Sequence, residues 1–99
     1  ADVAARFGGE EFAILLPELQ LPLVVKRAEE AMEKIRREVF VQGERQIRFT
    51  VSMGIAQLMP RETTDQWIKR ADTALYQSKN SGRDRYTVAA NISLTEDVA

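Results

Sequence analysis

Two adjacent glycines, Gly8 and Gly9, constrain the fold of this chain most, because they separate two short apolar-rich runs. Glycine has no Cβ, so it adopts backbone conformations and allows close approaches that other residues forbid. Residues 2–7 and 11–16 are therefore predicted to be the two strands of a β-hairpin. Pro17 ends the second strand, since proline has no amide N–H to donate to a sheet.

Two carboxylates, Glu10 and Glu11, directly follow the glycines at the tip of this predicted hairpin. Carboxylate oxygens are the hard ligands that Mg²⁺ prefers when it also holds the phosphates of a nucleotide. Adjacent strand residues point to opposite faces, so both can be direct metal ligands only if the turn twists them together. Taken alone, the pattern is equally compatible with an ordinary hairpin turn that carries two solvated acids.

After the hairpin, helices alternate with strands. Apolar residues recur every three or four positions from Leu21 to Val39, which predicts an amphipathic helix whose charged residues form a solvated face. Apolar and polar residues alternate over residues 47–55, which predicts a strand with one buried face. Gly54 lies within this strand and indicates a bulge or a close neighbour.

Thr63 and Gln66 fit a capping box at the start of a second helix, and Gly82 suits its C-cap. Residues 86–88 predict a last short strand, and the polar residues that follow indicate a tail or a connection. Four aromatic residues are expected in the core: Phe40, Phe49, Trp67 and Tyr76.

The composition excludes several classes of protein. The 99 residues, 44% of them hydrophobic and 29% charged, are typical of one small domain with one core. A net charge of −1 gives no electrostatic footprint for nucleic acid. The absence of cysteine and histidine excludes a disulfide framework and disfavours a zinc site or a catalytic triad. No apolar run approaches the roughly 20 residues of a membrane span, so we expect a cytoplasmic domain without membrane contact.

Three motifs follow one another along the chain: RFGGEEF at residues 6–12, FTVSMGIA at residues 49–56, and ADTALYQSK at residues 71–79 followed by GRDR at residues 82–85. In this order and spacing they resemble the GGDEF family of diguanylate cyclases. The first is similar to the family signature in its GGEEF variant, the second to a family strand, and the third to a further family motif. Ser78 stands where the family usually has Ala, and Asp84 where it usually has Asn; we expect neither to affect the chemistry.

The resemblance covers residues 1–88, leaving residues 89–99 as the tail. It implies an α/β fold of the α+β sandwich type, a partial ferredoxin-like βαββαβ sheet that lacks the first strand and early helices of the family domain. An open sheet edge and an uncovered apolar patch are therefore expected. We expect a homodimer, and in this chain strand exchange or pairing through the Asp2–Pro17 hairpin.

The activity implied by the resemblance is the metal-dependent conversion of two GTP into cyclic di-GMP and two pyrophosphates. Glu10 would hold Mg²⁺ (or Mn²⁺) and help to deprotonate the 3′-hydroxyl, with Glu11 as a supporting ligand. Gly8 and Gly9 would let the substrate approach the backbone, because they carry no side chain. The parts of the family site that precede residue 1 are absent, so this chain alone is expected to be inactive.

Three further charged residues have alternative interpretations. The resemblance implies that Lys79 and Arg83 bind the terminal phosphates of GTP, but at the end of a helix they could merely complement its dipole. Asp72 is expected to have a structural role, as a cap or as the partner of an arginine. Asp2 matches the acid of the family's RxxD product-inhibition site, whose arginine would lie before residue 1.

Two other functions remain open. The parent protein could be a non-catalytic module that senses GTP or cyclic di-GMP, although an intact GGEEF sequence argues against loss of catalysis. The chain could also be a folding unit without any activity.

Overall fold

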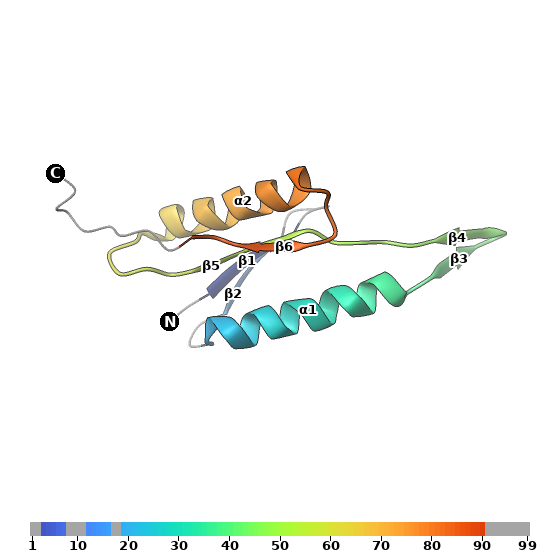
Figure 1. Ribbon diagram of the computed structural model, residues 1–99, viewed down its shortest axis with the longest axis horizontal. Helices are drawn as coiled ribbons and strands as arrows, with labels where there is room; N and C mark the ends of the chain where they lie inside the picture. The colour runs from blue at the N-terminus through green and yellow to red at the C-terminus, as the bar shows by residue number, and fades with distance from the viewer. Residues whose placement is uncertain (1–2, 8–11, 17–18, 91–99) are drawn as a thin grey trace.

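The computed structural model describes residues 3–7, 12–16 and 19–90. Along the chain the elements are β1 (Val3–Phe7), β2 (Phe12–Leu16), α1 (Leu21–Arg37), β3 (Phe40–Gln42), β4 (Arg45–Ile47), β5 (Met53–Gln57), α2 (Thr64–Asn80) and β6 (Tyr86–Val88). Figure 1 shows a sheet between the two helices, with the β3–β4 hairpin projecting from the body. The α+β fold expected from the sequence is confirmed.

The main sheet has four strands in the order β2-β1-β5-β6. Strand β1 is antiparallel to both β2 and β5, and β5 is parallel to β6. Phe7 lies opposite Phe12, so the predicted hairpin pairs around residues 8–11. Because β1 pairs directly with β5, strands β2, β1, β5 and β6 form one continuous sheet, and β3 and β4 pair separately. Exchange of a strand with a second copy stays a prediction.

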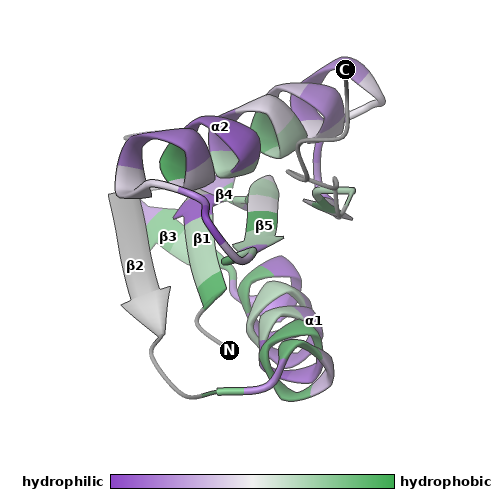
Figure 2. Ribbon diagram, turned by 90° about the vertical axis from the view of Figure 1, so that its left-hand side faces the viewer, coloured by the Kyte–Doolittle hydropathy of each residue, from purple (hydrophilic) through white to green (hydrophobic). Residues whose placement is uncertain are grey.

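Each face of the sheet is covered by one helix (Figure 2). The face toward α1 and the α1 residues against it form one buried cluster, made of Val3, Ala5, Val24, Ala28, Met32, Met53 and Ile55. The opposite face packs against α2 in a second cluster, made of Ala4, Ala56, Trp67 and Ala71. Alternate residues of β1 and β5 thus point to different helices, as the period of two in a strand requires.

The predicted strand over residues 47–55, with one buried face, is wrong in its bounds and in its burial. Residues 45–47 pair with residues 40–42 in the separate hairpin, and the sheet strand β5 begins only at Met53. Residues 53–56 are all buried, because small side chains on the second face let α2 lie directly on the strand.

Gly54 is the closest point of this contact. A Cβ at this position would overlap the carbonyl oxygen of Ala71 and the backbone nitrogen of Leu75. Of the two explanations for this glycine, the structure therefore supports the close neighbour.

The first helix ends at Arg37, two residues before the predicted end, because Glu38 is already in an extended conformation. Its charged residues pair along the exposed face as expected: Glu33 bonds Arg36 at 3.1 Å and Arg37 at 3.0 Å. The second helix begins with the predicted capping box, in which Thr63 and Gln66 bond each other's backbone N–H reciprocally.

The expectation that four aromatic residues lie in the core is correct only for Trp67. Its indole N–H donates to the carbonyl oxygen of Ala56 at 2.8 Å. Phe40 and Phe49 are about half exposed and contact each other edge to face near the projecting hairpin, away from the sheet. Tyr76 lies on the outer side of α2 and is 64% exposed.

Candidate functional site

One end of the sheet brings together the end of β1 and the end of α2. Met53, the first residue of β5, lies opposite Phe7 of β1 and beside Tyr86 of β6. Its carbonyl oxygen accepts a hydrogen bond of 2.8 Å from the hydroxyl of Ser78, in the last turn of α2. The chain therefore enters residues 8–11 at the same end of the sheet at which α2 stops.

Ser78 fixes the end of α2 to two strands. Its side chain is fully buried, and its hydroxyl bonds Met53 and lies 2.7 Å from the Thr87 hydroxyl of β6. This residue departs from the family's usual Ala, and we expected no consequence for the chemistry. That expectation stays a prediction. The structure gives Ser78 an anchoring role, for which a serine on the apolar stripe of a helix was the available signal.

The turn after α2 has an unusual backbone. Ser81 is the C-cap, so Gly82 follows the cap and does not form it. Gly82, Arg83 and Asp84 have positive φ angles of 117°, 61° and 48°. The amide of Arg83 donates to the carbonyl oxygen of Ser78 at 2.9 Å, the bond that closes a helix end of this type.

This turn holds the two predicted phosphate-binding cations, Lys79 and Arg83. Lys79 is partly buried in the last turn of α2, and Arg83 is exposed four residues later. Within the described residues neither side chain forms an ion pair with a carboxylate. The positions are compatible with both interpretations of these residues, phosphate binding and complementing the helix dipole.

Strand β1 is tied to α2 by an ion pair. Arg6 Nε donates to Asp72 Oδ1 at 2.5 Å, and the arginine side chain is 17% exposed. The expected structural role of Asp72 as the partner of an arginine is confirmed. Because Arg6 lies on β1 one residue before Phe7, which directly precedes the GGEEF segment, this pair also fixes the strand that leads into that segment.

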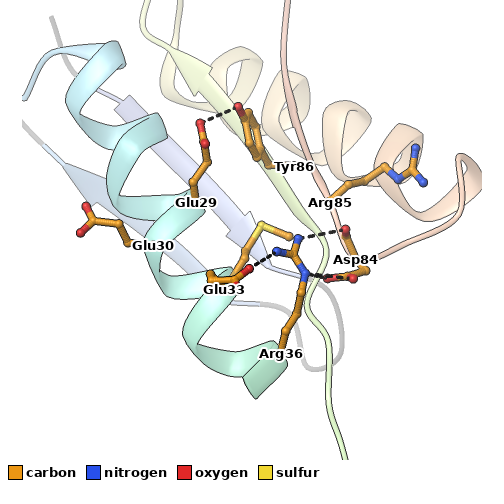
Figure 3. Close-up of a pocket in the computed structure, with 8 residues that line it drawn as sticks. Glu29, Glu30, Glu33, Arg36, Asp84, Arg85 and Tyr86 are labelled. Carbon is orange, nitrogen blue, oxygen red and sulfur yellow. Dashed lines mark hydrogen bonds and ion pairs between the residues drawn. The ribbon is translucent and has the colours of Figure 1, made fainter. Parts of the chain in front are cut away.

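Helix α1 reaches the same turn from the opposite face of the sheet. Arg36 Nε bonds both carboxylate oxygens of Asp84, at 2.8 and 3.0 Å, and its Nη1 bonds Glu33 at 3.1 Å (Figure 3). The hydrogen bond to Asp84, opposed in part by burial, raises the pKa of Arg36. The expectation that Asp84 does not affect the chemistry stays a prediction, and the structure adds this contact with Arg36. The signal in the sequence for this contact was an acid, Asp84, two residues after Gly82 in the turn that follows the helix.

An open groove of about 550 Å³ lies along this contact between α1 and β6. The Tyr86 hydroxyl donates to Glu29 Oε1 at 3.0 Å across it. Burial, and then this bond, raises the pKa of Tyr86. Met32 contributes the apolar part of the lining, with further charged residues around it: Glu30, Glu33, Arg36, Asp84 and Arg85.

The other predicted site residues lie outside the described residues: Asp2, Gly8, Gly9, Glu10 and Glu11. Their metal, substrate and inhibitory-site roles stay predictions. Among residues 3–7, 12–16 and 19–90, no three acidic side chains converge on a point that could hold a metal.

Comparison with known proteins identifies the family. Residues 1–85 match the family model described as "Diguanylate cyclase, GGDEF domain". The chain belongs to the GGDEF family. It is 41% identical over 88 residues to diguanylate cyclase DgcM of Escherichia coli, and 34% identical over 92 residues to diguanylate cyclase A of Treponema denticola. The resemblance seen in the three motifs is therefore confirmed.

Solved GGDEF structures share the fold of this chain. The GGDEF domain of DgcB from Caulobacter crescentus, in complex with c-di-GMP, superposes with a TM-score of 0.77 at 35% identity, over 83% of this chain and 50% of that one. Diguanylate cyclase SiaD from Pseudomonas aeruginosa, in complex with its activator SiaC, gives a TM-score of 0.74 at 35% identity, over 89% and 34%.

The GGDEF chain spans only part of these proteins. Its matches cover about 90% of its own length but 21% of DgcM and 25% of the Treponema cyclase. In the described part of the chain, no helix has both the length and the apolar character needed to cross a membrane.

Proposed function

We propose that this GGDEF chain forms part of a diguanylate cyclase site that joins two GTP into cyclic di-GMP and two pyrophosphates. The observation that supports the proposal is the junction at Met53. Phe7, which directly precedes the GGEEF segment, lies opposite Met53, and Ser78 of α2 bonds the Met53 carbonyl. The residue before the GGEEF segment and the residue before Lys79 are therefore both held at Met53.

In this proposal the cations act on the phosphates of GTP. Lys79 and Arg83 neutralise the terminal phosphates, so that pyrophosphate can leave with its charge compensated. The anchored end of α2 keeps the two side chains in place before the substrate arrives. Phosphoryl transfer depends mainly on such positioning and charge neutralisation, which explains how a site without histidine or cysteine could suffice.

The carboxylates of the signature act at the reacting end of the substrate. In this proposal Glu10 would hold the divalent cation, Mg²⁺ or Mn²⁺, and would help to remove the proton of the 3′-hydroxyl, with Glu11 as a supporting ligand. When bound, the cation neutralises phosphate charge. Gly8 and Gly9 leave the backbone open to the nucleotide.

The reaction also requires two copies of the domain. Each 3′-oxygen attacks the α-phosphorus of the other GTP, so two half-sites must face each other in a homodimer. A cytoplasmic location is part of the proposal, because GTP is a cytoplasmic substrate. Asp2 would be the remnant of a product-inhibition site.

The test is the turnover of the intact protein that contains this chain. We expect Lys79→Ala and Arg83→Ala each to lower kcat/KM for GTP by about 10- to 100-fold, as for a lost charge-assisted hydrogen bond. Lys69→Ala, which removes an exposed lysine from the same helix, is the matched control and should leave turnover within about two-fold. If Lys79→Ala and Arg83→Ala kept the same turnover as the Lys69→Ala control, the phosphate-binding role of Lys79 and Arg83 would be rejected.

A second candidate is a module that binds cyclic di-GMP or GTP without turnover. The DgcB structures in complex with c-di-GMP favour it, because they show that GGDEF domains of this fold bind the nucleotide. Calorimetry of the intact protein with GTP and Mg²⁺, beside a product assay, separates the two functions. Tight binding without product would favour the sensing module.

A further inference from the structure

The turn that carries Arg83 is held in a strained conformation. Arg83 and Asp84 have φ angles of 61° and 48°, which side chains with a Cβ disfavour. Such conformations persist only where surrounding contacts enforce them. The contacts of this turn therefore decide where the Arg83 guanidinium lies.

Two of these contacts come from the turn itself and from α2. The Arg83 amide donates to the Ser78 carbonyl, and Arg85 Nε donates to the Arg83 carbonyl at 3.0 Å. The guanidinium of Arg85 lies in the space that a side chain at Gly82 would fill, because a Cβ there would come within 2.7 Å of it.

The third contact comes from the other layer of the molecule. Arg36 belongs to the last turn of α1, which covers the face of the sheet opposite α2. Its guanidinium bonds both carboxylate oxygens of Asp84, and Nη2 reaches the Asp84 backbone carbonyl at 3.5 Å (Figure 3). Glu33 bonds the same guanidinium at Nη1, which fixes its orientation from within α1.

We propose that Arg36 is a positioning residue for the cyclase site: it holds Asp84, and through Asp84 it holds the strained turn that aims Arg83 at the substrate's phosphates. The inference rests on the proposed function for the role of Arg83. The family's usual Asn at position 84 is neutral and cannot form this charged pair. The ion pair between Arg36 of α1 and the turn therefore depends on the Asp that this chain has at position 84.

The first test measures the stability of the turn, and it does not depend on enzyme activity. Hydrogen exchange of the Arg83 amide, followed by NMR in the intact protein, reports the bond to Ser78. Arg36→Gln should lower the protection of this amide by about ten-fold, as expected for loss of a charged contact. Arg37→Gln is the matched control, because among the residues that the structure describes Arg37 pairs along α1 with Glu33 alone and is exposed. Equal protection of Arg83 in the two variants would overturn the inference.

The second test is a double-mutant cycle in the same protein. Arg36→Gln should lower kcat/KM for GTP by about ten-fold, less than the roughly 100-fold that a displaced catalytic group can cost. In an Arg83→Ala background it should have no further effect, because there is no guanidinium left to position. The same fold-loss in both backgrounds would show that Arg36 acts on the whole fold and would overturn the proposal.

A replacement variant and an independent readout cover the cases in which one of these tests fails. If Arg36→Gln does not fold, Asp84→Asn removes the charged pair with a smaller change and takes its place. Normal turnover by Arg83→Ala would reject the phosphate role of Arg83 itself, and the exchange comparison would still decide whether Arg36 holds the turn.

Discussion

Individual residues explain why α2 can lie so close to the sheet. Gly54 provides the space for the backbone of α2, and the buried pair of Glu62 and Arg70 fixes the start of this helix. Arg70 bonds both carboxylate oxygens of Glu62 and also the backbone carbonyls of Gln57 and Ala90. One side chain thus connects α2 to the far ends of β5 and β6.

Gly54→Ala should destabilise the fold by about 3 kcal/mol, because the added Cβ meets backbone atoms that cannot move aside. Gly43→Ala is the comparison. Gly43 has a φ of 64° but open space around it, so that change should cost only about 1 kcal/mol. Urea denaturation of the two variants measures the difference, and equal losses would contradict the close contact at Gly54.

The Glu62–Arg70 pair predicts a dependence of stability on pH. The hydrogen bond from Arg70, opposed in part by burial, lowers the pKa of Glu62 below its ordinary value of 4.5. A carboxyl whose pKa is lower in the folded state stabilises the protein above its unfolded pKa, and this contribution is lost as the pH falls through the folded value.

Glu62→Gln should therefore destabilise the protein by about 2 kcal/mol at pH 7, since it leaves a partly buried arginine without its charged partner. The difference from the wild type should shrink steadily below pH 4.5. Urea unfolding of both proteins at a series of pH values checks this. A difference that stays constant down to pH 3 would show that the charge of Glu62 does not stabilise the fold.

At the scale of elements, the sequence correctly predicts those helices and strands whose signals come from residues close together in the chain. The Thr63 and Gln66 capping box, the hairpin around Gly8 and Gly9, and the amphipathic pattern of α1 each depend on residues close in sequence. Burial of β5 on both faces depends on a helix that follows it in the chain, so alternation alone indicated one buried face. For the same reason the partners of Ser78 and Asp84 were not predicted, because they lie on other elements.

The anchoring of α2 by Ser78 leads to a prediction about this element. Ser78→Ala, which introduces the residue usual in the family, leaves the Met53 carbonyl and the Thr87 hydroxyl without this partner. We expect a loss of about 1–2 kcal/mol in the free energy of unfolding. Thr73→Ala is the control, because in the described part of the chain its hydroxyl bonds the Lys69 carbonyl alone, at the exposed face, and it should cost under about 0.5 kcal/mol. Similar losses for both variants would contradict the anchoring role.

At the scale of the whole molecule, the main sheet and its two helices bring the end of β1 and the end of α2, which carries Lys79, to one end of the fold. The end of α1, the end of α2 and the end of β1 meet there, joined by Arg36 with Asp84 and by Ser78 with Met53. At the opposite end of the sheet, Arg70 joins α2 to the ends of β5 and β6. The role of residues 8–11, which is a prediction from the sequence, is therefore the point on which the proposed function depends.

The 99-residue chain by itself should make no detectable cyclic di-GMP, because it spans only 50% of the DgcB chain that it matches and each tenfold of rate corresponds to about 1.4 kcal/mol of lost stabilisation. We also expect it to associate through the Asp2–Pro17 hairpin. Sedimentation at micromolar concentration and chromatography after incubation with GTP and Mg²⁺ test both expectations. A folded monomer would contradict the predicted association. Clear synthesis of cyclic di-GMP would contradict the predicted inactivity.

The most direct test of the proposed function is synthesis of cyclic di-GMP by the intact protein and its Glu10→Ala variant, each incubated with GTP and Mg²⁺ and analysed by chromatography. Glu44→Ala, in the exposed turn between β3 and β4, is the control for loss of an acidic residue. We predict product from the wild type and the Glu44 variant and none from Glu10→Ala. Near-normal synthesis by Glu10→Ala would show that the signature carboxylate does not hold the metal on which the proposed reaction depends.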